Sequence, residues 1–104
     1  SLPVFEHLAA MVRAGHLVDA DGHDTYLPHV DRLLDVPVRF IHGERNECYR
    51  PAATERTEQW LRAAGHRDVD RFVVPAHGHL DCIFGDDAAD VAFPLVLDHL
   101  ERNA

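Results

Sequence analysis

The sequence predicts a mixed α/β fold with parallel strands in its second half. Two short apolar segments rich in β-branched and aromatic residues, 37–41 and 71–74, have the character of strands. A helical pattern of about four turns separates them, and another helical pattern follows the second. Because strands joined by a crossover helix normally pair in parallel, this order predicts a β-α-β-α unit over 36–104. Residues 1–35 are expected to form a helix and an irregular lead-in.

The first part of the chain carries one helix signal and one turn signal. Apolar side chains recur at helical spacing across 2–14, Pro3 lies in the first turn, and Gly15 follows as a terminator. The sequence Asp-Ala-Asp-Gly at 19–22 has the composition of a tight turn. Residues 26–34 mix apolar and polar side chains and are expected to be irregular, with at most a short helical turn.

The elements of the second part have recognisable boundaries. The loop 44–50 leads to Pro51, which suits the first position of a helix predicted over 52–64. The loop 76–81 follows the second strand. The last helix is predicted over 88–102, capped by Asp86 or Asp87 and kinked at an internal proline, Pro94, which removes one backbone hydrogen bond.

Composition excludes several classes of partner. The 104-residue chain is 46% hydrophobic and 27% charged, values typical of folded globular proteins. Its formal net charge of −8 argues against binding to nucleic acid or to an anionic membrane surface. Its longest apolar runs fall far short of the ~20 residues that a membrane-spanning helix needs. The chain is therefore expected to be cytoplasmic, with no nucleic-acid partner and no membrane span.

The predicted sheet is too small to be self-sufficient. Parallel sheets need cover on both faces and several neighbouring strands, and only two strands are predicted here. Five large apolar residues on the last two predicted helices are expected to be core or faces that await further strands: Trp60, Leu61, Phe93, Leu97 and Leu100. The expected partner is the remainder of a larger domain or a second copy of the chain.

The residues that could carry chemistry lie in two loops. Ligands of open parallel sheets bind at the carboxyl ends of the strands. Two loops leave such ends here, 42–50 with the sequence His-Gly-Glu-Arg-Asn at its start and 75–85 with the sequence Pro-Ala-His-Gly-His-Leu-Asp. If the strands are neighbours, these loops face each other and their polar groups meet.

These two loops resemble the end of the α/β-hydrolase fold, in which a strand ends in His-Gly-x-x-acid and a later Gly-His precedes the final helix. The run Gly-His-Leu-Asp-Cys-Ile-Phe-Gly at 78–85 most closely resembles the hydrolase domains associated with cholesterol-oxidase-like flavin oxidoreductases of the glucose-methanol-choline type. It is more distantly similar to acid lipases, where Asn-His-Leu-Asp surrounds the catalytic histidine. The resemblance extends from about residue 18 to the C-terminus. It implies that 1–104 is the C-terminal third of such a domain.

The resemblance implies that His79 is the histidine of a catalytic triad that hydrolyses a small acyl or ester substrate. Asn46 falls on the acid position, where an amide can orient an imidazole but cannot stabilise the imidazolium. Glu44 and Glu47 flank it, and either is an alternative acid. The nucleophile would come from a Gly-x-Ser-x-Gly turn elsewhere, because the only serine is Ser1. The chain alone is expected to be inactive, and no cofactor or metal is expected.

Alternatives remain open. The chain is also consistent with a non-catalytic hydrolase-like domain attached to a cholesterol-oxidase-like oxidoreductase. The pattern His77-x-His79-x-Asp81 also occurs in metallo-β-lactamase-like hydrolases, where two imidazoles share a zinc ion, although Cys82 stands here where that family has another histidine. Cys48 and Cys82 either form a disulfide or, as we expect, remain separate thiols.

Three neighbours of the predicted site have expected supporting roles. Asp81 is expected to accept hydrogen bonds from loop amides and to brace the histidine turn. His77 is expected to face solvent or to support His79. His42 lies at a strand end, where it either lines the site or packs.

Overall fold

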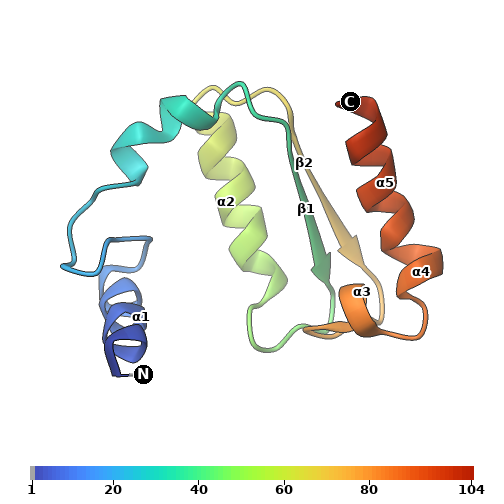
Figure 1. Cartoon of the computed structure of the whole chain (residues 1–104), viewed down its shortest axis with the longest axis horizontal. Coiled ribbons are helices and arrows are strands. Elements are labelled where there is room, and N and C mark those ends of the chain that lie inside the picture. Colours follow the sequence, from blue (N-terminus) through green and yellow to red (C-terminus); the bar gives the residue numbers. More distant parts are fainter. Residues whose placement is uncertain (1) are drawn as a thin grey trace. The chain divides into compact units, whose positions relative to one another are not determined.

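The computed structural model describes residues 2–104. The chain divides between Leu33 and Leu34 into two compact units. The first contains the helix α1 (Leu2–Ala14) and the 3-10 helix η1 (Leu27–Leu33) (Figure 1). The helix predicted over the first residues is confirmed at both ends.

The chain reversals of the first unit follow the predicted chemistry. Gly15 ends α1 with φ at +73°, a conformation that glycine adopts without steric penalty. The Asp19 carboxylate accepts the backbone N–H groups of Asp21 and His23, which confirms the predicted turn. The segment predicted to be irregular contains η1, whose helical backbone is interrupted at His29.

The second unit is a β-α-β unit followed by three helices, and its elements are β1 (Val38–Gly43), α2 (Pro51–Ala63), β2 (Val69–Val74), α3 (Asp81–Phe84), α4 (Ala88–Val91) and α5 (Phe93–Arg102). The two strands pair in parallel, with Val38 opposite Val69 and Gly43 opposite Val74. Helix α2 covers one face of the sheet and α5 lies on the other (Figure 1). The predicted mixed α/β architecture with parallel strands is therefore confirmed.

The Arg39 side chain, which is only 3% exposed, attaches α5 to the sheet. The Arg39 guanidinium makes a bidentate ion pair with Asp70, its register partner on β2, with both N–O distances at 2.8 Å. It also donates to the Leu95 carbonyl and to the Asp98 carboxylate on α5. The guanidinium carbon lies 4.7 Å from the centroid of the Phe72 ring, a cation–π contact. Each of the three guanidinium nitrogens of Arg39 therefore donates to at least one acceptor.

The end of the chain differs from the prediction of one kinked helix. Two helices, α4 and α5, meet at Ala92, and Pro94 lies in the first turn of α5, where a missing N–H leaves no bond unmade. Asp87 occupies the N-cap position of α4, one of the two predicted positions, but its side chain makes no capping hydrogen bond. The loop predicted over 76–81 leads directly into the short helix α3.

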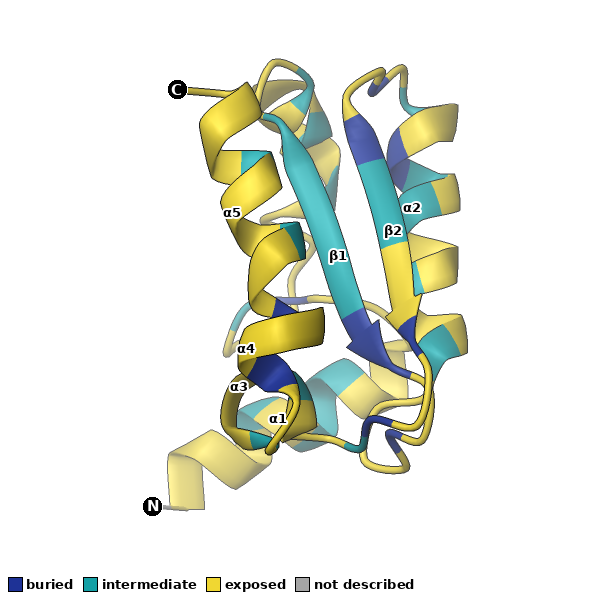
Figure 2. Cartoon of the chain, turned by 90° about the vertical axis from the view of Figure 1, so that its right-hand side faces the viewer, coloured by how far each residue is buried: buried dark blue, intermediate teal, exposed yellow. Residues whose placement is uncertain are grey.

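The hydrophobic core of the second unit is small. Its buried apolar side chains are Leu61, Val69, Val74, Ala88 and Ala92. Of the five large apolar residues predicted for core or unpartnered faces, only Leu61 is buried, and Phe93, Leu97 and Leu100 are between 46% and 61% exposed. Figure 2 shows the outer surface of α5 as exposed along most of its length. No described helix has the length and apolar character to cross a membrane.

Candidate active site

The loop after β1 and the loop after β2 lie side by side at the carboxyl edge of the sheet. The Glu44 N–H donates to the Val74 carbonyl at 2.9 Å, and the Arg45 N–H donates to the His77 carbonyl at 2.8 Å. The Glu44 carboxylate accepts the Ala76 N–H at 3.0 Å. The predicted juxtaposition of the two loops is therefore confirmed by three hydrogen bonds.

The close approach of the two loops requires glycine at the end of β1. A Cβ placed on Gly43 would lie 2.5 Å from the Gly78 carbonyl oxygen and closer still to that of His77. Both obstacles are backbone atoms, which cannot rotate away as a side chain can. Gly43 therefore lets the backbone of the histidine loop pass directly over the strand end.

The histidine loop is braced from within. The Asp81 carboxylate accepts the Gly78 N–H at 2.6 Å, as predicted. His77 is buried, and its Nδ1 donates to the Pro75 carbonyl at 2.8 Å, so of the two roles expected for it, facing solvent is wrong. Ala76, with φ at +61°, turns the backbone sharply after the strand. These contacts fix the backbone on which His79 is carried.

His79 itself is exposed at the surface of this loop. Its ring lies 5.5 Å from the ring of Tyr49, measured between centroids, with the planes inclined at 45°. No hydrogen bond connects its imidazole to any of residues 2–104. Both ring nitrogens are therefore available to a reacting group, and the neighbouring loop contacts the ring through Tyr49.

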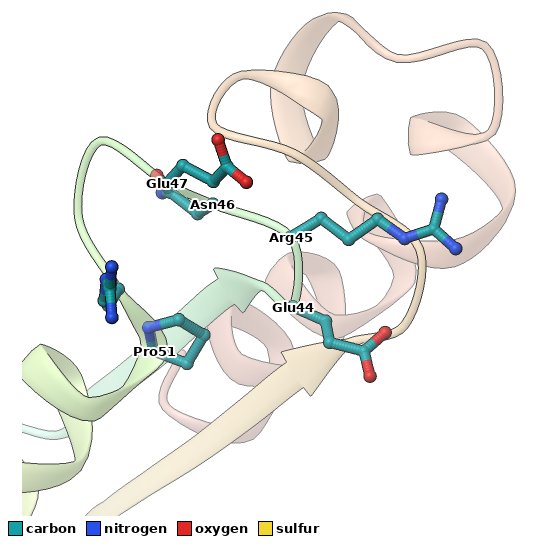
Figure 3. A pocket seen from close by; sticks show the side chains of 6 residues that line it. Glu44, Arg45, Asn46, Glu47 and Pro51 are labelled. Carbon is teal, nitrogen blue, oxygen red and sulfur yellow. The ribbon is translucent and has the colours of Figure 1, made fainter.

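The three predicted acid-position residues have different surroundings. Asn46 is buried, and its Oδ1 accepts the Tyr49 N–H at 2.9 Å. Glu44 is committed to the Ala76 N–H. Glu47 is exposed and makes no hydrogen bond or ion pair with a described residue. In Figure 3 the Glu44 and Glu47 carboxylates point in different directions. None of the three is hydrogen-bonded to His79, and Glu47 is the one of the two carboxylates without a partner among the described residues.

A shallow hollow opens beside the acid-position residues. Its volume is about 490 Å³, and two carboxylates and two guanidiniums line it, from Glu44, Arg45, Asn46, Glu47, Arg50 and Pro51 (Figure 3). The lining is therefore polar and of mixed charge. Its lining residues belong to the first loop and the start of α2, and none belongs to the histidine loop.

Sequence reasoning missed a polar network beneath the first loop. His42 is buried, its Nε2 donates to the Tyr49 carbonyl at 2.6 Å, and its Nδ1 lies 2.9 Å from the Thr54 hydroxyl. Arg71 donates to the same hydroxyl and to the Pro51 carbonyl. Of the two roles left open for His42, the contacts show packing. The alternation of side chains along β2, which points Arg71 toward α2, is the signal that could have revealed the network.

The zinc alternative finds no support in the arrangement of its ligands. His77 and Asp81 are turned to backbone groups of their own loop. Within residues 2–104, the only three potential ligands whose donor atoms lie within 4.8 Å of one another are Asp19, Asp21 and His23. The Asp19 carboxylate is already occupied by the turn described above, and its pKa is lowered chiefly by the Thr25 hydroxyl.

The two cysteines are separate thiols. Cys48 is exposed and Cys82 is partly buried, and both are free in this structure, as expected. Burial raises the pKa of the Cys82 thiol above its usual value, and the nearby Asp81 charge adds to this effect. A thiol with a raised pKa is a weak nucleophile at neutral pH. The raised pKa disfavours Cys82 as a substitute for the nucleophilic serine.

Comparisons with family models, with curated proteins and with solved structures found no match to this chain.

Proposed function

We propose that this chain is the C-terminal part of a serine-type α/β-hydrolase that cleaves small esters or related acyl compounds. The observation that carries the proposal is the pairing of the two loops at one sheet edge, which brings an accessible histidine next to a loop that carries two carboxylates and two guanidiniums. Parallel α/β sheets bind their ligands at this edge. The resemblance of the loop sequences to the end of the hydrolase fold supplies the reaction class.

His79 is the proton-transfer group in this proposal. It accepts the proton of a serine hydroxyl, supplied from outside these residues, as the oxygen attacks the acyl carbon. It then donates that proton to the departing alkoxide, and the cycle repeats with water to release the acid. We assign the orienting role to Glu47 because Asn46 and Glu44 already accept backbone N–H groups, whereas the Glu47 carboxylate has no partner among the described residues. Glu47 makes no hydrogen bond to His79 in this structure, so the role requires that contact to form in the complete protein.

A second candidate function rests on the same contacts. The residue at the acid position, Asn46, bonds to its own loop rather than to His79. In this interpretation the acid-position residue stabilises its loop and no longer orients a histidine. This is expected of a non-catalytic hydrolase-like domain attached to a cholesterol-oxidase-like oxidoreductase. Such a domain would keep the fold of the two loops without proton transfer.

The experiment that separates the two candidates is hydrolysis of 4-nitrophenyl acetate by the complete translation product of the gene. The hydrolase proposal predicts measurable turnover, and a fall of between about 10²- and 10⁴-fold in kcat/KM for His79→Ala. His99→Ala, on α5, is the matched control and should retain full activity. Absence of turnover, or activity that survives His79→Ala, would contradict the hydrolase proposal.

A further inference from the structure

Tyr49 is held by buried side chains on both sides of its backbone. Its N–H donates to Asn46 Oδ1 at 2.9 Å, and its carbonyl accepts from His42 Nε2 at 2.6 Å. Asn46 is only 9% exposed and His42 only 6%. A loop residue normally satisfies these backbone groups with water, so two buried side chains devoted to one residue indicate that its position matters.

We call Asn46 and His42, which bond the two backbone groups of Tyr49, the clamp. Its His42 half is attached to the regular secondary structure. His42 lies at the end of β1, and its other ring nitrogen contacts the hydroxyl of Thr54 on α2. Arg71 on β2 donates to that hydroxyl. Hydrogen bonds through His42 and Thr54 thus connect the backbone of Tyr49 to both strands and to the helix α2.

The ring of Tyr49 projects from this clamp to His79. It is exposed, with Tyr49 62% accessible, so it contributes little to the core. Its centroid lies 5.5 Å from that of the His79 imidazole at an inclination of 45°, within the range of favourable aromatic pairs. Tyr49 and His79 form the one pair of neighbouring aromatic rings among the described residues. The Tyr49 ring is thus the described side chain placed to restrict the His79 imidazole, which has no hydrogen bond to a described residue.

We propose that Tyr49 is a positioning residue for His79, and that Asn46 and His42 serve to hold Tyr49 rather than to contact His79. This assigns to Asn46 a role different from that of a triad acid. The catalytic consequence rests on the proposed function, whereas the restriction of the imidazole does not. A histidine already oriented loses less side-chain freedom when the reacting groups align.

The restriction is tested by NMR of the 104-residue chain. The carbon-bound protons of the His79 imidazole should carry a ring-current displacement in the wild type and in Tyr49→Phe, and lose it in Tyr49→Leu. Resonances of His99, which lies on α5 in the same unit, should not move. His79 resonances that stay at their wild-type positions in Tyr49→Leu, with the fold intact, would overturn the proposal.

The clamp is tested through Asn46. Asn46→Asp keeps an oxygen acceptor for the Tyr49 N–H and should preserve the ring-current displacement at His79, whereas Asn46→Ala should reduce it. Equal His79 spectra in these two variants would contradict the clamp. Because Tyr49 is at the surface, Tyr49→Leu gives a result even where Asn46→Ala fails to fold.

The catalytic consequence is tested in the complete translation product with 4-nitrophenyl acetate. Tyr49→Leu should lower kcat by between about tenfold and 100-fold, with Tyr49→Phe restoring most of the activity. Unchanged kcat in Tyr49→Leu would overturn the positioning role. If the wild type is inactive but the NMR displacement is present, the proposed hydrolase function fails and the restriction of His79 by Tyr49 stands.

Discussion

At the scale of single residues, Gly43 is the point on which the paired loops depend. Its missing side chain leaves room for the backbone of His77 and Gly78 at the strand end. We expect Gly43→Ala to destabilise the second unit by about 1–3 kcal/mol, the usual range for forced overpacking. Urea unfolding followed by circular dichroism measures the difference.

Gly78→Ala provides the matched control for Gly43→Ala. A Cβ on Gly78 would meet only the Asp81 carboxylate at 3.1 Å, which is the end of a movable side chain. Its effect on the free energy of unfolding should be clearly smaller. Equal effects for the two variants would show that the close approach at Gly43 does not limit the fold.

The assignment of Glu47 makes a second residue-scale prediction. Glu47→Gln removes the charge that would stabilise the His79 imidazolium, and should lower kcat/KM for ester hydrolysis by up to about 10⁴-fold. Glu55→Gln, on the exposed side of α2, is the control and should have no effect. A Glu47→Gln protein with full activity would remove Glu47 from the mechanism.

Residue roles in the candidate site were only partly predictable from sequence. The brace formed by Asp81 followed from a short carboxylate next to free loop amides. The role of Asn46 could not be predicted. Its Oδ1 accepts a backbone N–H three residues later, and the composition of the loop does not distinguish this contact from the orientation of a histidine. The burial of His77 depends on the approach of β1, which is a tertiary contact.

At the scale of elements, the ion pair between Arg39 and Asp70 joins the two strands and, through Asp98, the helix α5. The Arg39 guanidinium lowers the pKa of Asp70 below its ordinary value of 3.8. A depressed folded-state pKa stabilises the protein above the unfolded value. That contribution is lost as the pH falls through the folded-state pKa.

Asp70→Asn should therefore be destabilising at neutral pH and less so in acid. We expect a loss of about 1–2 kcal/mol at pH 7, below the value for a fully buried pair because the Asp70 side chain is 35% exposed. The difference from wild type should shrink below about pH 3.8. Urea unfolding at pH 7 and pH 3 measures both values, and a difference that grows in acid would contradict the ion-pair account.

Elements with strong local signals were predicted well from sequence. Helix α1 has a terminating glycine, Gly15, and the turn at Asp19 has its own turn residues, and both elements agree with the prediction. The strand β2 begins two residues earlier than predicted, at Val69, because pairing with β1 extends it. The break between α4 and α5 depends on how the chain packs near Ala92, and local helix propensity does not report it.

At the scale of the whole molecule, the chain buries little apolar surface for its length. Five apolar side chains form the buried core of the second unit, and both strands are edges of a two-stranded sheet. Isolated small sheets with few buried side chains are marginal in water. The free energy of unfolding in urea should therefore lie at or below about 5 kcal/mol, the lower end for folded domains. A free energy of unfolding above about 10 kcal/mol would show that the chain is stable without further strands or helices packed against it.

The central claim is that an accessible histidine, carried beside a neighbouring loop at one sheet edge, activates a serine nucleophile. The most direct measurement is the rate at which a fluorophosphonate probe labels the complete translation product, with the adduct located by mass spectrometry. The account predicts one phosphonylated serine outside the 104 residues, and a labelling rate that collapses in His79→Ala while His99→Ala reacts normally. An adduct formed at the same rate without His79, or no adduct at all, would contradict it.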